Sequence, residues 1–355
     1  MKNSNILNMT RSFIRTASLF LRGTIKRELY PYDIFMKTIH YLTLLQKHYN
    51  FHAIKIRRKY LNLKGTYAII YVLMGLYSEL WDVSLKRIYH YNEDLDVILV
   101  NPGGFHSDKA INLAKSYGFS YVELWPNNIE CAQNYVINNV IMSPLVIKID
   151  DDIFLTKYTI RNLIRAYKQV KEEGIDVGFL APVLNVNNVS YVAFLKTLNL
   201  MDEYTHLFEK PIFARNWRKQ KIWYDPVVAR WIWENSLPLN HIAQIFAKKN
   251  AGLYEYIPVR FSISCILFER AFLLKHYGFS SAGPRATKGD LHIPIRGTIV
   301  QRDEDSINFY VDNEMHTRIL VLDSFAGHLA YFPQRELMLR WFLKNKGKLL
   351  EDLKD

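Results

Sequence analysis

The strongest constraint on the fold is the alternation of strand-like and helix-like segments from residue 67 to residue 174. Apolar runs of strand length stand at residues 67–74, 95–100, 121–125 and 145–149, and a segment with helical periodicity follows each of them. This spacing indicates βαβ units, so we expect an α/β fold with a mainly parallel sheet flanked by helices. Sheets of this kind bind ligands at the carboxyl ends of their strands.

The fourth apolar run leads directly into three consecutive aspartates, Asp150, Asp151 and Asp152. Adjacent carboxylates repel one another, and the repulsion is costly where the groups are desolvated. Carboxylate oxygens are ligands that suit Mg²⁺ or Mn²⁺, and such ions fill their other positions with water and substrate phosphate. The alternative is an acidic turn before the helix that follows Thr156, but one aspartate would suffice there. We therefore interpret Asp150 and Asp152 as metal ligands.

Two further motifs follow in the second half of the chain. The segment "FSISCILFERAFLLKHYGFSS" predicts a strand, a helix and a Gly-Phe turn, and "RDEDSINFYV" then places Asp303, Glu304 and Asp305 together. The segment "ILVLDSFAGHLAYF" predicts a closing strand that ends near His328. An acidic helix start is the simpler interpretation of the first cluster, and a structural histidine that of His328.

These three motifs, taken with "AQNYVINNVIMSPLVIKIDDD", resemble the glycosyltransferases of the GT-A fold, and family 2 in particular. The resemblance covers roughly residues 65–332 and implies a Rossmann-like nucleotide-binding half. It implies a metal-dependent, inverting transferase that moves a hexosyl or N-acetylhexosaminyl group from a nucleotide-diphosphate sugar. The expected acceptor is a glycan or glycolipid of bacterial surface polysaccharide biosynthesis, the donor a UDP-sugar, and the metal Mn²⁺ or Mg²⁺.

The resemblance also implies roles for individual residues. Asp305 corresponds to the general base, with Glu304 and Asp303 as rivals that the spacing leaves open, and His328 to a metal ligand. The donor-binding positions are Asp151, Asn134 and Asn101. Asn101 stands where the family usually has an aspartate that reads the nucleotide base.

A long segment separates the two acidic motifs, and we expect residues 185–258 to form an insertion or an acceptor lobe within a catalytic domain of residues 65–345. Four of the seven tryptophans of the chain belong to it: Trp217, Trp223, Trp231 and Trp233. Aromatic faces stack on the apolar faces of sugars, so these residues are candidates for an acceptor platform. Packing in the core of the lobe is the alternative.

Residues 1–64 form a basic arm, which we expect to be helical. They hold thirteen Lys and Arg against two Asp and Glu, an excess of eleven within the net charge of +12. In a helix over residues 6–27, four basic residues form one stripe opposite an apolar face: Arg11, Arg15, Arg22 and Lys26. The arm could lie on an anionic membrane surface, pack on its own domain, or be a mitochondrial presequence.

The amino-acid composition limits the classes of protein to which this chain can belong. With two cysteines, Cys131 and Cys265, the chain cannot be a disulfide scaffold, and a reducing compartment fits best. We expect a cytoplasmic protein, peripheral on the inner face of the cytoplasmic membrane. A metal-dependent phosphoryl-transfer enzyme would also cluster aspartates. A non-catalytic protein could use the basic arm on nucleic acid, but we expect no nucleic-acid partner.

Overall fold

The computed structural model describes residues 55–75, 77–125, 127–212, 220–279, 293–295, 298–300 and 303–353. Most of the predicted basic arm, with the stripe of the 6–27 helix, therefore lies outside the described residues. Trp217 of the predicted acceptor platform lies outside them as well.

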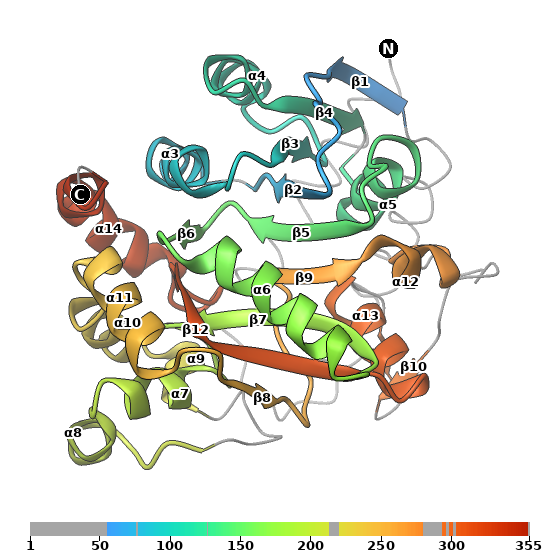
Figure 1. Ribbon diagram of the computed structural model, residues 1–355. Coiled ribbons are helices and arrows are strands. Elements are labelled where there is room, and N and C mark those ends of the chain that lie inside the picture. The colour runs from blue at the N-terminus through green and yellow to red at the C-terminus, as the bar shows by residue number, and fades with distance from the viewer. Residues whose placement is uncertain are drawn as a thin grey trace, which may run out of the picture.

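A ten-stranded sheet with the order β1-β4-β3-β2-β5-β9-β7-β12-β6 forms the centre of the protein, with β8 added on β12 (Figure 1). β2 pairs in parallel with β3 and β5, β3 with β4, and β7 with β12, while β9 runs antiparallel between β5 and β7. The expected α/β class with a mainly parallel sheet is confirmed. The strands are β1 Lys55–Tyr60, β2 Ala68–Leu73, β3 Asp96–Asn101, β4 Ser120–Trp125, β5 Leu145–Asp150, β6 Ile153–Leu155, β7 Val177–Leu184, β8 Tyr254–Tyr256, β9 Cys265–Glu269 and β12 Thr317–His328; a separate hairpin joins β10 Ile293–Ile295 to β11 Thr298–Val300.

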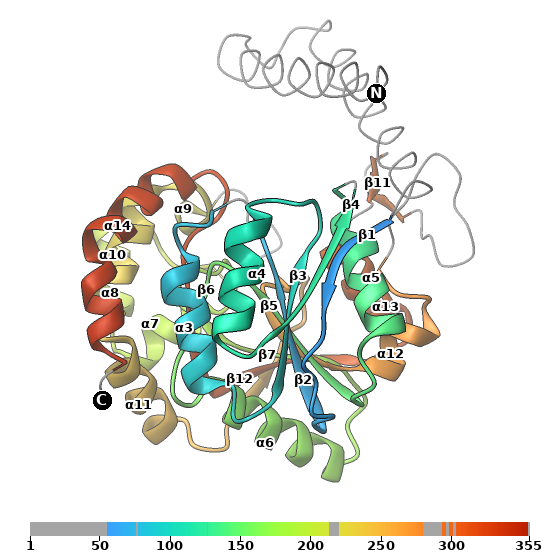
Figure 2. The same cartoon turned by 90° about the horizontal axis from the view of Figure 1, so that it is seen from above.

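Helices cover both faces of the sheet, and this is why its central strands are apolar along their whole length. One core layer joins the sheet to α3 Trp81–Tyr91, α4 Ser107–Ser116 and α6 Thr159–Glu172. The other joins it to α5 Ile129–Asn139, α12 Arg270–Lys275 and α13 Asp303–Asn313, and Figure 2 shows α3 and α4 separated from α5 and α13 by the strands. Successive residues of β2, such as Ile70 and Tyr71, belong to opposite layers.

Residues 185–258, the predicted insertion, lie between β7 and β9. They contain α7 Tyr191–Thr197, α8 Met201–Leu207, α9 Lys221–Tyr224, α10 Pro226–Glu234 and α11 Leu239–Lys249, followed by β8. The last helix, α14 Arg335–Glu351, follows β12 and packs against α10 and α3. In the described part of the chain, no helix has both the length and the apolar character needed to cross a membrane.

The structure differs from the sequence prediction around Glu123, whose carboxylate is fully buried on β4. Residues 55–60, expected to be helical, form β1 antiparallel to β4, and Arg57 reaches the Glu123 Oε1 atom at 3.2 Å. Ser107 at the start of α4 is a residue type that often caps a helix, but it instead donates to the same oxygen at 3.0 Å, while the Tyr121 hydroxyl donates to Oε2 at 2.9 Å. A buried carboxylate requires such partners, and this requirement outweighs the local preference of both segments.

Candidate functional site

The strand order reverses between β2 and β5, because the chain proceeds from β2 through β3 and β4 to one edge and then returns to β5 on the other side. Open α/β sheets bind ligands in the crevice outside the carboxyl ends of the strands at such a reversal. β2 ends at Leu73, which pairs in register with Asp150 at the end of β5. The aspartate triplet therefore stands at the expected position of a ligand site.

The three aspartates point to three different sets of partners. Asp150, whose side chain is 30% exposed, lies 2.5 Å from the Nζ atom of Lys148. Asp151 is buried and accepts hydrogen bonds from the Gly75 amide and the Trp81 indole, both at 2.6 Å. Burial raises the pKa of Asp151 to about 7. These partners give Asp151 a role in joining the ends of β2 and β5.

Asp152 is buried beside His328, which β12 delivers from the opposite side through its antiparallel pairing with β6. The His328 Nε2 atom lies 3.8 Å from the Asp152 Oδ2 atom. The Nδ1 atom lies 2.6 Å from the carbonyl oxygen of Val186. A carbonyl can only accept, so Nδ1 carries a proton, and Nε2 is the nitrogen that the neutral ring would offer to a metal on the side of Asp152. Arg335 at the start of α14 donates to Asp152 Oδ2 at 2.7 Å.

The donor atoms fit an open metal site better than a closed one. Within the described ranges, no group of three or more His, Cys, Asp and Glu side chains is arranged to hold a metal ion. Asp152 and His328 supply an oxygen and a nitrogen donor side by side, whereas Asp150 is turned toward Lys148. Magnesium and manganese accept few protein ligands when substrate phosphate and water complete the shell. The pair formed by Asp152 and His328 fits such an ion, and Asp150 as a third ligand remains a prediction.

The second acidic cluster begins α13. Asp303 accepts a hydrogen bond from Gln133 of α5 at 2.9 Å. Arg260 forms ion pairs with Glu304, at 2.7 Å, and with Asp305. Burial raises the pKa of Glu304, and Arg260 acts against this effect. Asp305 is the less exposed of the two, with 11% of its side chain accessible against 29% for Glu304.

Lys148 connects the two acidic clusters. Its side chain is almost completely buried on β5, and its Nζ atom also donates to the carbonyl of Ile263 at 2.9 Å. Burial lowers the pKa of Lys148, but the charges of Asp150, Asp303 and Glu304 outweigh this and raise it. A protonated lysine is therefore held between the clusters, and it reduces the repulsion that would otherwise oppose their approach.

Asn101 and Asn134 stay predicted donor-binding residues, and both side chains already have partners within the protein. Asn101 is fully buried, and its side chain accepts from the amides of Gly103, Gly104 and Phe105. Its amide group donates to the Phe105 carbonyl at 2.7 Å. Asn134 exchanges two hydrogen bonds of 2.7 Å with the backbone of Phe279. Both amides are used to hold a loop, which explains their position without a ligand.

The predicted tryptophan platform is wrong for Trp233. This side chain is fully buried, and its indole donates to the carbonyls of His328, at 3.1 Å, and Leu329. Trp231 is half-buried and packs edge to face on Tyr204 and Phe208. Core packing therefore accounts for these two residues.

Trp223 is the described member of the predicted platform that packs against Tyr331. It is half-buried, and its ring centroid lies 6.3 Å from that of Tyr331, which in turn contacts the ring of His328. An acceptor role for Trp223 is compatible with this position and stays a prediction.

Sequence reasoning missed the three cations of the site. Lys148 could have been found, because it interrupts an otherwise apolar strand, "LVIKI", immediately before the aspartates. Arg260 and Arg335 gave no such signal, since neither stands beside one of the two acidic motifs in the sequence. Each balances a carboxylate that the sequence had assigned to catalysis or metal binding.

No known protein family matches this sequence, and no curated protein is similar to it. Among solved structures, it is similar to the mannosyltransferase PcManGT from Pyrobaculum calidifontis in complex with GDP-Man and Mn²⁺, with 13% identity, a TM-score of 0.43, and coverage of 88% of this chain and 69% of that one. It is also similar to residues 1–349 of TarS from S. aureus in complex with UDP-GlcNAc, with 12% identity and a TM-score of 0.28 over 34% of each chain. Likenesses of this size do not assign residues, and the roles discussed below rest on the chain itself.

Proposed function

We propose that this protein is a metal-dependent glycosyltransferase of the GT-A fold that uses a nucleotide-diphosphate sugar. The observation that carries the proposal is the position of Asp152 beside the Nε2 atom of His328 at the strand-order reversal. A second acidic cluster, Glu304 and Asp305, is linked electrostatically to this place through Lys148. A leaving-group site and a proton acceptor are the two elements that glycosyl transfer requires.

The leaving group of such a reaction is a nucleoside diphosphate, which develops negative charge as the glycosidic bond breaks. A divalent cation would neutralise that charge. Asp152 and His328 are the residues that would hold the cation, with Asp150 as a further candidate. Arg335, whose guanidinium already lies at Asp152, would supply a second positive charge for the diphosphate.

The acceptor hydroxyl must lose a proton when it attacks the sugar from the face opposite the leaving group, which gives inversion. We propose Asp305 as the base that accepts this proton. Its ion pair with Arg260 favours the ionised carboxylate that a base requires. Glu304 is the rival, and burial raises its pKa.

The remaining assignments extend the same proposal. The acceptor is a glycan or glycolipid, and the sugar is a hexosyl or N-acetylhexosaminyl group from a UDP-sugar. The enzyme acts in the cytoplasm at the inner face of the membrane, with the basic residues of 1–54 as its contact to anionic lipid. The excess of positive charge in that segment supports this location.

Asp152→Asn tests the proposal, because it keeps the shape of the side chain and removes its charge. Binding of Mn²⁺, UDP-GlcNAc and GDP-mannose is measured by calorimetry on both proteins. We expect the metal-dependent part of donor binding to be lost in the variant, while the melting temperature confirms that it folds. Asp202→Asn, on the exposed surface of α8, is the matched control and should bind as the wild type does. Equal Mn²⁺-dependent donor binding by both variants, or binding of neither donor by the wild type, would contradict the proposal.

A further inference from the structure

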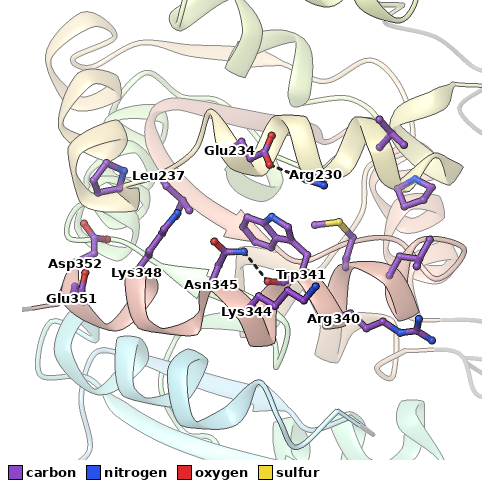
Figure 3. A pocket seen from close by; sticks show the side chains of 15 residues that line it. Arg230, Glu234, Leu237, Arg340, Trp341, Lys344, Asn345, Lys348, Glu351 and Asp352 are labelled. Atoms are coloured by element: carbon purple, nitrogen blue, oxygen red, sulfur yellow. Dashed lines mark hydrogen bonds and ion pairs between the residues drawn. The ribbon is translucent and has the colours of Figure 1, made fainter.

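A long groove lies between α10 and α14, outside the site described above (Figure 3). Its volume is about 1210 Å³, larger than the 300–1,000 Å³ typical of small-molecule pockets. Leu237 and Leu337 contribute apolar surface, and Arg340, Lys344 and Lys348 contribute charge. The groove is thus suited to a ligand that is longer than a nucleotide sugar and is both polar and apolar.

The positive charge of the groove is only partly neutralised. Arg230 forms an ion pair with Glu234 at 2.7 Å, and Asp352 forms one with Arg87 at 3.0 Å. Lys344 and Lys348 are exposed and form no ion pair with any residue that the structure describes. Two ammonium groups on successive turns of α14 therefore face the groove with their charge available to an anion.

Trp341 gives the groove an aromatic surface. The residue is half-buried, and Figure 3 shows its indole between α14 and α10. The indole is supported from behind by Trp233, with ring centroids 5.5 Å apart. A fixed aromatic ring beside charged and amide side chains is suited to the apolar face of a sugar ring.

The groove follows the same helix that contacts the site, although it lies along another face of that helix. α14 starts at Arg335, which pairs with Asp152, and Leu337 of the same turn lines the groove. From Leu337 to Lys348, a helix that rises 1.5 Å per residue advances about 17 Å. A chain bound along this face of α14 could therefore span several sugar units.

We propose that the groove between α10 and α14 binds an anionic glycan, as an extended subsite for the acceptor. This proposal rests on the glycosyltransferase function and names the class of acceptor that the site would take. Trp341 stacks on a sugar ring, and Lys344 and Lys348 pair with carboxylate or phosphate groups further along the chain. A membrane surface is the less suitable occupant, because Lys344, Lys348 and Trp341 line a groove between two helices, which admits a single chain more readily than a flat bilayer.

The test uses the full chain with Lys344→Gln and Lys348→Gln combined. The probes are a hyaluronan octasaccharide, which carries carboxylates, the neutral maltooctaose, and vesicles of phosphatidylglycerol. Affinities are measured by calorimetry, and vesicle binding by co-sedimentation. The control combines Lys168→Gln with Lys248→Gln, two exposed lysines on α6 and α11 that remove the same charge outside the groove.

We expect the hyaluronan octasaccharide to bind the wild type more tightly than maltooctaose does, and to lose about tenfold in affinity in the groove variant, as for the loss of charge-assisted contacts. The control should retain its affinity, and higher salt should weaken binding to the wild type. Equal affinity in the two variants, or a loss confined to vesicle binding, would overturn the proposal. Because UDP-GlcNAc and GDP-mannose bind elsewhere, their affinity in the groove variant reports separately on the proposed function.

Discussion

The buried ion pair between Arg87 and Asp352 leads to a quantitative prediction about how α14 is held in place. The Arg87 side chain has no exposed surface, and its Nη2 atom lies 3.0 Å from the Asp352 Oδ2 atom. Its other donors reach the carbonyls of Leu155, at 2.5 Å, and Leu349, at 2.9 Å. Burial lowers the pKa of Arg87, and the charge of Asp352 opposes that effect.

Asp352→Asn keeps the size of the side chain and leaves the guanidinium buried without its counter-charge. Breaking a buried pair from one side typically costs about 3–5 kcal/mol. Since a folded protein is stable by only about 5–15 kcal/mol, this is a large part of the total. Arg87→Met combined with Asp352→Asn removes both charges, so we expect the double variant to recover much of the loss.

These differences are measured by urea unfolding, followed by circular dichroism, of the wild type, Asp352→Asn, the double variant and one control. Glu336→Gln is the matched control, because Glu336 pairs with Arg340 on the exposed surface of the same helix, where a pair is worth about 0–1 kcal/mol. The reasoning would be refuted by a cost below about 1 kcal/mol for Asp352→Asn, or by a double variant that is no more stable than that single variant.

Two other predictions follow from the same principles. Asp305→Asn should lower turnover about 10²–10⁴-fold with donor affinity unchanged, and a larger loss for Glu304→Gln would show that the base is the neighbouring residue. Asp96 is buried, which favours its neutral form, but the amides of residues 64–66 donate to it and bring its pKa below the usual value. Its carboxylate therefore stabilises the fold above its usual pKa of about 3.9, and this contribution disappears as the pH falls through the folded-state value. Acid titration of the unfolding free energy should show a smaller decrease below about pH 4 in Asp96→Asn, and an unchanged decrease would contradict the assignment.

The order of strands and helices from residue 67 to residue 174 could be predicted because it depends on local periodicity. Apolar runs of strand length and segments with helical spacing are read within a few residues, and β2, β3, β4 and β5 all lie within a residue or two of the expected bounds. The same holds for the position of Asp150–Asp152 at a strand end, since the triplet directly continues an apolar run. Local reasoning could not predict the partners of Glu123. Arg57 on β1 and Ser107 on α4 contact its carboxylate because the fold buries it.

The alternating architecture, and the end of the sheet at which the acidic residues gather, can be derived from the amino-acid sequence alone. The partner of each carboxylate depends on the folded chain: Lys148 for Asp150, Trp81 for Asp151, and His328 with Arg335 for Asp152. The reason is distance along the chain, since Asp152 and Arg335 are 183 residues apart and meet only because β12 returns beside β6. Burial likewise depends on the folded chain. The aromatic composition of residues 185–258 suggested a surface for sugars, but the buried Trp233 indole instead holds the backbone at His328.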